Sequence, residues 1–526
     1  MKLIEGLRLQ VGYNIQDIKD VIFKEYNIKS KDILDLHILK ESIDARRKPN
    51  IYCNINVAIE VLNSNKRINS LKDIEVSYLG IKSENRTSLK GRPVIVGFGP
   101  AGMFMALKLA KSGLRPIVVE QGDTVDIRQQ KIDQFWKTGD LDIYSNVHFG
   151  EGGAGTFSDG KLNSNLSNEF CKLVTNELIL HGAPKEIFYK SKPHIGTDNL
   201  RSVVRNIREE ILRLGGEIFF GTRLEDILIY DGQISGIRVK NLNIDQDIVI
   251  DCNVVVLAIG HSAKNVFKVL KEKGVIMEQK PFAMGVRIEQ LQRDINISQY
   301  GRDNVNLPAA DYKLVEHLDN GRSVFTFCMC PGGEVVASSS EKGTVVTNGM
   351  SYFARNKENA NSALLVNIDP KDFGSTDVLA GFDFQSRYEK LAFELGGSNY
   401  NAPCESVGSF LNIQSDGKVI NASYKPGVTY TKIEKCLPEF VVDALRVALP
   451  RMDRKIKNFA NPNNVLTAIE SKSSCPVKIV RMDNNQTSIE GLFAVGEGAG
   501  YAGGIMSSAQ DGLKIAESVI EYLCKK

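Results

Sequence analysis

The stretch 94–120, VIVGFGPAGMFMALKLAKSGLRPIVVE, decides the fold. Its first three residues are an unbroken apolar run, which is typical of a parallel strand buried on both faces. A GxGxxG pattern follows at 97–102, and residues 103–112 have the apolar spacing of a helix. Residues 116–120 form a second strand that ends on an acid. This order predicts a complete β-α-β unit whose helix N-terminus faces the phosphates of a dinucleotide.

The GxGxxG pattern alone is weak evidence, because it occurs three times, beginning at Gly97, Gly150 and Gly498. Only the first match combines a preceding strand, a helix and, 18 residues after Gly102, the acid Glu120 to accept a ribose hydroxyl group. The second runs into a non-helical segment and is better interpreted as a loop that a flat or anionic group can approach. The third is followed by one helix and leaves no room for another β-α-β unit. We therefore assign dinucleotide binding to the first match, with an ordinary glycine turn as the alternative.

The composition argues against several broad classes of function. Lysine and arginine number 66 against 63 aspartate and glutamate, a balance of +3 that gives no broad basic field for nucleic acid. No apolar run approaches the ~18 residues of a membrane span. The nine cysteines contain no CxxC pair, and the six histidines show no metal-ligand spacing. We expect a cytoplasmic protein with no membrane segment and no metal centre.

Two distant segments discriminate between dinucleotides through a resemblance. Residues 254–260, VVVLAIG, form a buried strand that ends in a glycine turn. Residues 491–497, GLFAVGE, form another strand, which ends in an acid just before the last helix. In these features the chain resembles the large FAD superfamily of the glutathione-reductase and p-hydroxybenzoate-hydroxylase types. The resemblance implies FAD as the cofactor and implies that Glu497 contacts its ribityl chain.

The last helix, from about residue 505 to residue 523, begins directly after two glycines. The free N–H groups and the positive dipole end at such a start would stabilise the negative charge of a reduced flavin. This effect is typically ~0.3–1 kcal/mol at a surface and up to ~2 kcal/mol when partly buried. The alternative is an amphipathic helix that only covers the sheet.

Longer segments resemble a narrower group, the bacterial FAD-dependent dehydrogenase or NAD-utilising dehydrogenase family, over essentially the whole chain. The segments are 150–162 (GEGGAGTFSDGKL), 193–200 (PHIGTDNL), 282–289 (FAMGVRIE), 327–336 (FCMCPGGEVV), 347–351 (TNGMS), 361–366 (NSALLV) and 496–504 (GEGAGYAGG). Residues 289–292 read EQLQ where the family commonly has EHPQ, and residues 470–476 read ESKSSCP where it commonly has ETRTSSP. Either the family's histidine is dispensable as a catalytic acid, or this member has a changed substrate.

The resemblance implies that FAD contacts both glycine loops, the acid after the second strand, and the turns around the closing strand. The residues expected to bind FAD are Gly97, Gly99, Pro100, Ala101, Gly102, Glu120, Gln121, Arg128, Gly153, Gly155, Gly260, Gly496, Glu497, Gly503, Gly504 and Ile505. Arg128 resembles the arginine that follows the acid in hydroxylase-type members. An arginine on a solvated helix face is the alternative.

Other candidates for chemistry are weaker. Cys328 and Cys330 are two residues apart in a strand, so both thiols would face one cavity as a redox pair, or else pack in the core. Arg287 and Glu289 share a face in the same way, and they would anchor an anionic substrate or form a structural ion pair. Lys161, beside the second glycine loop, would lie near the flavin or the phosphates.

The remaining polar candidates have simple structural alternatives. Lys161, Ser158 and Lys472 lie in polar turns, where a solvated side chain is the simpler interpretation. His194 would contact the cofactor or the substrate, or form a structural hydrogen bond. Because the chain has no second complete β-α-β unit, NAD(P)H would dock only transiently, or the substrate itself would supply the electrons.

We therefore predict an α/β protein in four segments. A small N-terminal α/β domain at 1–81 and a linker at 82–92 precede a discontinuous Rossmann-like FAD domain at 93–260 plus 485–526, with an inserted α+β substrate or cap domain at 261–484. The leading hypothesis is an FAD-dependent oxidoreductase that transfers hydride to or from a small molecule. The alternatives are a flavin monooxygenase that uses NAD(P)H, and a flavoprotein whose N-terminal domain binds RNA or a protein partner. A homo-oligomer is compatible with each of them.

Overall fold

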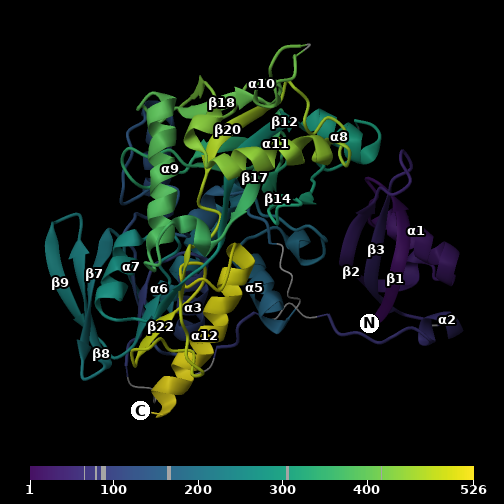
Figure 1. Ribbon diagram of the computed structural model, residues 1–526. Helices are drawn as coiled ribbons and strands as arrows, with labels where there is room; N and C mark the ends of the chain where they lie inside the picture. The colour runs from purple at the N-terminus through teal and green to yellow at the C-terminus, as the bar shows by residue number, and fades with distance from the viewer. Residues whose placement is uncertain are drawn as a thin grey trace.

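The computed structural model describes residues 1–63, 65–76, 80–83, 91–162, 168–303, 307–415 and 417–525. Most of the predicted linker, residues 84–90, lies outside the described residues. Three large sheets with their helices occupy different parts of the molecule, and the N-terminal sheet stands at one side (Figure 1).

The central sheet of the nucleotide-binding part has five parallel strands in the order β22-β10-β4-β5-β6. The strands are β4 (Val94–Val96), β5 (Ile117–Val119), β6 (Glu217–Phe219), β10 (Val255–Leu257) and β22 (Leu492–Ala494). This order brings the stretches near residues 100 and 500 to the same edge of one sheet. Both expected β-α-β strands, 94–96 and 116–120, lie side by side in it.

Two helices on one face of this sheet approach each other closely. Helix α3 (Pro100–Lys111) packs on α12 (Ile505–Lys525), the C-terminal helix drawn in yellow (Figure 1). A Cβ atom on Gly512 would lie only 2.3 Å from the backbone oxygen of Ala101, so only glycine permits this crossing. The close packing places the starts of both helices beside each other.

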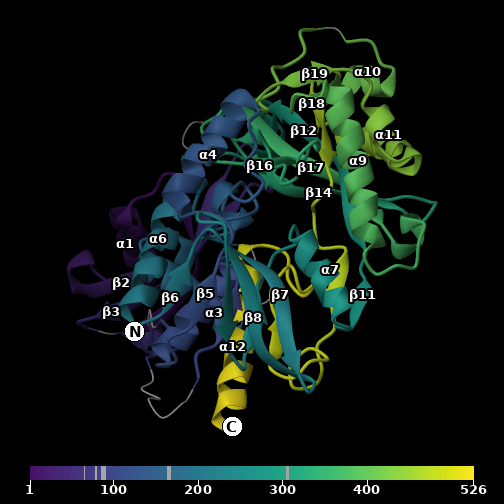
Figure 2. The same cartoon turned by 90° about the vertical axis from the view of Figure 1, so that its left-hand side faces the viewer.

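The other elements of this part are a meander and four helices, of which Figure 2 labels β7, β8, α4, α6 and α7. The meander is antiparallel, with β7 (Thr222–Tyr230), β8 (Gln233–Asn241) and β9 (Gln246–Asp251). The helices are α4 (Val125–Thr138), α5 (Glu169–Leu180), α6 (Thr197–Arg213) and α7 (Lys264–Glu272). On α6 the buried residues recur at helical spacing, so that its apolar stripe covers the sheet.

The cap is built on a mixed sheet of seven strands in the order β13-β14-β17-β12-β20-β18-β19. The strands are β12 (Phe282–Leu291), β13 (Val315–His317), β14 (Ser323–Cys330), β17 (Asn359–Ile368), β18 (Ala402–Ser406), β19 (Val428–Tyr430) and β20 (Val465–Glu470). The helices of the cap are α8 (Gln292–Tyr300), α9 (Ala380–Gly396), α10 (Val407–Leu411) and α11 (Glu439–Asp453). Two short antiparallel pairs join β15 (Glu334–Ala337) to β16 (Thr347–Met350) and β11 (Met277–Gln279) to β21 (Val477–Ile479).

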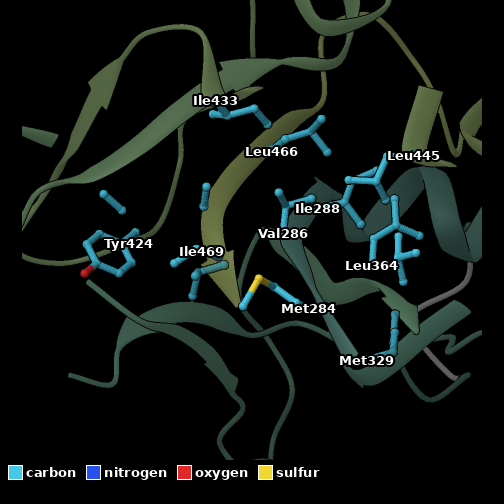
Figure 3. Close-up of a cluster of buried hydrophobic side chains, with 14 of the residues drawn as sticks. Met284, Val286, Ile288, Met329, Leu364, Tyr424, Ile433, Leu445, Leu466 and Ile469 are labelled. Carbon is cyan, nitrogen blue, oxygen red and sulfur yellow. The ribbon is translucent and has the colours of Figure 1, made fainter. Parts of the chain in front are cut away.

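The main core lies between this sheet and its helices. Met284, Val286 and Ile288 alternate along β12, and they point towards Leu364 of β17 and Leu445 of α11 (Figure 3). Every one of these side chains is fully buried. Burial of each contributes about 1.5–3 kcal/mol, which holds the sheet as a rigid wall.

The N-terminal part is a three-stranded antiparallel sheet with one long helix. It contains β1 (Lys2–Gln10), β2 (Ile33–Asp44) and β3 (Tyr52–Val61), with α1 (Ile15–Tyr26) and α2 (Lys66–Asn69). The sequence predicts strands near residues 3–11 and 51–62 and a helix at 15–26, but it does not predict β2, whose burial pattern is irregular. Glu41 of β2 donates its backbone N–H to Tyr189 O at 2.8 Å, which joins this sheet to the nucleotide-binding part.

The predicted fold class, an α/β protein with a Rossmann-like parallel sheet, is confirmed. Within the residues that the structure describes, no helix has the length and apolar character needed to cross a membrane.

Candidate cofactor and substrate cavity

A cavity of about 520 Å³ lies between the carboxyl ends of the parallel strands and the cap sheet. Twelve of the residues expected to bind FAD line it. They are Gly97, Gly99, Pro100, Ala101, Glu120, Gly153, Gly155, Gly260, Glu497, Gly503, Gly504 and Ile505. Gly102, Gln121, Arg128 and Gly496 are not part of its lining.

The first glycine loop is shaped by close backbone contacts. Gly97 has φ +100°, and a Cβ atom there would lie 2.4 Å from Ala258 O, so this position requires glycine. A Cβ atom on Gly102 would lie 2.1 Å from Gly97 O. Pro100 is the first residue of α3, where its fixed φ and missing N–H suit a helix start. The loop therefore presents the backbone of a helix N-terminus to the cavity.

Glu120, at the end of β5, binds backbone groups from three segments. Its carboxylate accepts hydrogen bonds from the N–H groups of Phe98 (2.8 Å), Gly122 (3.0 Å) and Gly150 (2.9 Å). The side chain is buried but lines the cavity. The acid that was expected to bind a ribose thus also joins the two glycine loops.

Arg128 lies elsewhere than the resemblance implied. Its guanidinium is fully buried and donates hydrogen bonds of 2.7 Å to the backbone oxygens of Asn146, Val147 and Glu151. Burial lowers the pKa of Arg128 to about 9. Because it neither lines the cavity nor lies on a solvated face, its observed role is to hold the second glycine loop in place.

The start of α12 leaves open space in the cavity. A Cβ atom on Gly503 or Gly504 would have no neighbour within 4 Å, and the same holds for Gly260 across the cavity. Gly496, by contrast, has no room for a side chain, because its Cβ atom would lie 2.7 Å from Ala101 Cβ. The glycines that line the cavity therefore form a cradle that a large flat ligand can occupy.

Two buried polar groups of the cavity wall have no hydrogen-bond partner among the residues that the structure describes. They are His261 Nε2 and Ser262 Oγ, which follow β10. The other nitrogen of the ring, His261 Nδ1, lies 3.1 Å from Oε1 of Glu497. Unsatisfied buried groups of this kind require a partner, and the polar atoms of FAD would supply one. The glycine cradle and these groups fit the cofactor that the sequence predicted.

His148, which was not predicted as a site residue, lies beside His261, and Lys472, which was a weak candidate, lies near His148. The rings of His148 and His261 have their centres 5.1 Å apart. Burial lowers the pKa of His148 well below its usual value, and burial also lowers the pKa of Lys472. Lys472 donates to Ser340 Oγ at 2.7 Å and lines the cavity, so its interpretation as a solvated loop side chain was wrong. In the sequence, the one signal for His148 and His261 as site residues was that they lie beside Gly150 and Gly260.

Two pairs of residues on the cap strands are arranged differently from the prediction. The first pair is Arg287 and Glu289. Arg287 does not bond Glu289; it makes a bidentate ion pair with Glu470, at 2.7 and 2.9 Å. Glu289 instead accepts hydrogen bonds from Ser423 and Asn359. Arg287 is fully buried and is not part of the cavity lining, so it is not placed to touch a substrate.

A register shift interrupts β14 between Phe327 and Cys330. Cys328 consequently lines the cavity, whereas Cys330 is fully buried behind it. The two thiols therefore do not face the cavity together, contrary to the prediction from strand alternation.

Charged residues of two further segments also line the cavity. Lys161 lines it, with its Nζ atom 3.5 Å from Asp159 Oδ2, and Ser158 lies beside them. Lys192 pairs with Asp311 at 2.6 Å on the opposite rim. His194 does not line the cavity, and its ring stacks on Phe353 with the ring centres 5.2 Å apart.

Comparisons with known proteins match two parts of the chain to family models and the whole chain to one relative. A family model described as "FAD-dependent protein, C-terminal domain-like" matches residues 281–473, and residues 1–60 match a domain of unknown function. A Clostridium beijerinckii protein described only as uncharacterized is 44% identical over 529 residues, which covers 98% of each chain.

More distant similarities involve parts of the chain or the fold alone. The thiamine thiazole synthase of Thermotoga maritima is 26% identical over 226 residues, 41% of this chain and 76% of that protein. Among solved structures, the glycerol-3-phosphate dehydrogenase of Bacillus halodurans complexed with FAD covers 83% of this chain and 64% of its own. Its sequence identity is 11% and its TM-score is 0.34.

Proposed function

The chain belongs to the same family as the Clostridium beijerinckii protein, and from this membership and the match of its cap to FAD-dependent proteins we propose that it is an FAD-dependent oxidoreductase. Its substrate is a small molecule that enters between the FAD domain and the cap. One observation carries the proposal. The starts of α3 and α12, the acids Glu120 and Glu497, and an open glycine cradle all line one cavity.

When bound, FAD would supply a centre that accepts or donates a hydride, which carries one electron pair. The residues that would hold it are the first glycine loop, Glu120, the second glycine loop and the start of α12. The N–H groups of that helix start would stabilise negative charge in the cavity. The cap sheet covers the cavity and limits the access of water.

Proton transfer in the cavity would use His261. Glu497, 3.1 Å from Nδ1, favours the tautomer that carries its proton on Nδ1. The Nε2 atom, which has no hydrogen-bond partner among the described residues, then remains an acceptor beside the cavity that His261 lines. A histidine in this arrangement can take a proton from the substrate as its hydride leaves, or return one in the reverse direction.

We propose NAD(P)H as a transient electron donor. The described residues contain one parallel sheet of the dinucleotide-binding type, and its strand ends already belong to the proposed FAD site. Nicotinamide would then reach the cavity from its open, lysine-bearing rim. We also propose the cytoplasm as the compartment, and the N-terminal domain as the surface for any protein partner.

The test is an anaerobic titration of purified holoprotein with NADH and with NADPH. The proposal predicts a flavin absorbance band that bleaches with one of the two donors or with a metabolite that the cavity accepts. Incorporation of oxygen into the product would instead identify a monooxygenase. Well-folded protein that retains no FAD when the cofactor is present in excess would overturn the proposal.

A further inference from the structure

Cys328 lies on the cavity wall in an unusual backbone conformation. Along β14, Phe327 pairs with Ala363 and Cys330 with Asn361, so three residue steps on β14 oppose two on β17. The extra residue forms a β-bulge, and Cys328 has φ +41°, a left-handed conformation that is costly for a residue other than glycine. Such bulges turn a side chain away from its regular direction, and here the thiol reaches the cavity.

The bulge also brings the two sulfur atoms together. The Cys330 thiol lies 3.3 Å from the backbone oxygen of Cys328 and is hydrogen-bonded to the Cys328 side chain. Cys328 is the member that a small molecule in the cavity can reach, and Cys330 is fully buried directly behind it. An outer thiol with an inner thiol in contact is the arrangement of an attacking and a resolving cysteine.

The charges around the pair favour a thiolate on the outer cysteine. Arg287 donates to the backbone oxygen of Cys328 at 3.0 Å, and its charge and that of Lys161 act on the Cys328 sulfur. Asp159 and Glu470 are the nearby acids, but Asp159 binds Arg355 and Glu470 binds Arg287. The hydrogen bond from Cys330, then the positive charges, lower the pKa of Cys328, while the same hydrogen bond and burial raise the pKa of Cys330.

We propose that Cys328 and Cys330 are a redox-active dithiol through which the flavin of the proposed function reduces a small disulfide. This inference rests on the proposed function, because FAD is the electron donor to the pair. Cys328 of the pair lines the same cavity as the expected FAD-binding residues.

The electrons and protons of both steps balance. The Cys328 thiolate attacks one sulfur of the substrate disulfide, and the other sulfur leaves as a thiolate. Cys330 then attacks Cys328 Sγ, forming the Cys328–Cys330 disulfide and releasing the second half of the substrate, while the Cys330 proton passes to a released thiolate. The Cys328–Cys330 disulfide would take one electron pair and one proton from bound reduced FAD, which restores one thiolate and one thiol.

Chemical trapping tests the cysteines without measuring turnover. Reduced holoprotein is treated with hydroxyethyl disulfide, alkylated with iodoacetamide and analysed by peptide mass. We expect wild-type protein to contain an unalkylated Cys328–Cys330 disulfide, and Cys330→Ser to accumulate a mercaptoethanol adduct on Cys328. Cys328→Ser should leave Cys330 without an adduct, and Cys404→Ser, a buried cysteine of β18 outside the cavity lining, should behave as wild type.

Reductive titration tests the connection to the flavin. Fully oxidised wild-type holoprotein should consume about two equivalents of dithionite per FAD, since flavin and disulfide each take one electron pair. The Cys328→Ser variant should fold, because Cys328 is only partly buried. It should consume about one equivalent of dithionite per FAD. Three results together would overturn the redox pair and leave the proposed function intact. The protein would retain FAD, the wild type would consume only about one equivalent of dithionite per FAD, and Cys330→Ser would carry no adduct on Cys328. Protein that retains no FAD would instead overturn the proposed function.

Discussion

His261 Nδ1 lies 3.1 Å from Glu497 Oε1, and this contact joins segments that follow two neighbouring parallel strands, β10 and β22. More than 200 residues separate them in the chain. Because the carboxyl ends of parallel strands meet at one edge of a sheet, each strand contributes one half of the pair. The contact fixes the ring of His261, a residue that lines the cavity and whose Nε2 atom is buried without a hydrogen-bond partner among the described residues.

We predict that His261→Phe weakens FAD binding. Phenylalanine keeps a ring beside His148 but removes Nε2 and the partner of Glu497. Loss of a hydrogen bond worth about 0.5–1.5 kcal/mol corresponds to a dissociation constant about two- to thirteenfold higher. Isothermal titration calorimetry with FAD measures this change. His194→Phe is the control, because His194 stacks on Phe353 and is not part of the cavity lining. Equal affinities in the two variants would refute the assignment.

Gly503→Leu should impair FAD binding without impairing folding. The φ of Gly503 is not in the left-handed region, and no atom lies within 4 Å of a Cβ atom placed there, so the protein tolerates the side chain. The same open space is where we expect the cofactor. The dissociation constant for FAD should rise at least about tenfold, or 1.4 kcal/mol, with a smaller rise in Gly503→Ala. Unchanged flavin content of Gly503→Leu would place the cofactor elsewhere.

Arg128→Met should destabilise the protein by about 3 kcal/mol or more. The change leaves three backbone oxygens without their buried donor and removes the charge beside Glu151. The control is Arg205→Met, which removes a half-exposed partner of Asp126 and should change stability by less than about 0.5 kcal/mol. Urea unfolding followed by circular dichroism compares them. If the two variants unfold alike, Arg128 does not support the loop.

Lys472→Met should stabilise the protein near neutral pH, with a benefit that shrinks as the pH rises. Burial lowers the pKa of Lys472 in the folded state, although Glu389 and Glu341 act in the opposite direction. Between the folded pKa and the ordinary value, the unfolded chain binds the proton and the folded chain does not, so wild-type stability rises with pH in that window. Below it, the folded protein bears the cost of a buried ammonium group.

Thermal unfolding at saturating FAD, from pH 7 to pH 10, measures the effect of Lys472→Met. Lys514→Met, an exposed lysine of α12, is the control and should give the same unfolding temperature as wild type at each pH. A Lys472→Met variant less stable than wild type at pH 7 would mean that the ammonium group is stabilising where it lies.

Much of the glycine-lined side of the cavity was predictable because its signals are local. A three-residue apolar run, glycines at 97, 99 and 102 and an acid at 120 belong to one continuous β-α-β unit. Backbone sterics and helix-terminus chemistry act over such short distances, as the contact of Gly102 with Gly97 O demonstrates. Glu497, which follows β22, was predicted as a site residue only through the resemblance to the FAD superfamily.

The cap wall could not be predicted in the same way, because strand register depends on distant partners. Simple alternation put Cys328 and Cys330 on one face, whereas pairing of β14 with β17 introduces a bulge. Arg287 pairs with Glu470 on a neighbouring strand instead of Glu289 on its own. Similarly, nothing near Lys472 in the sequence reveals that it lies among His148, Glu341 and Glu389.

The most direct test of the central claim is the FAD content of purified protein after incubation with excess cofactor and removal of the unbound part. The account predicts about one FAD per chain, held in the cavity between β4, β22 and the cap, and a strongly reduced content in Gly503→Leu. Folded wild-type protein that binds no FAD, or a variant that binds as much as wild type, would contradict it.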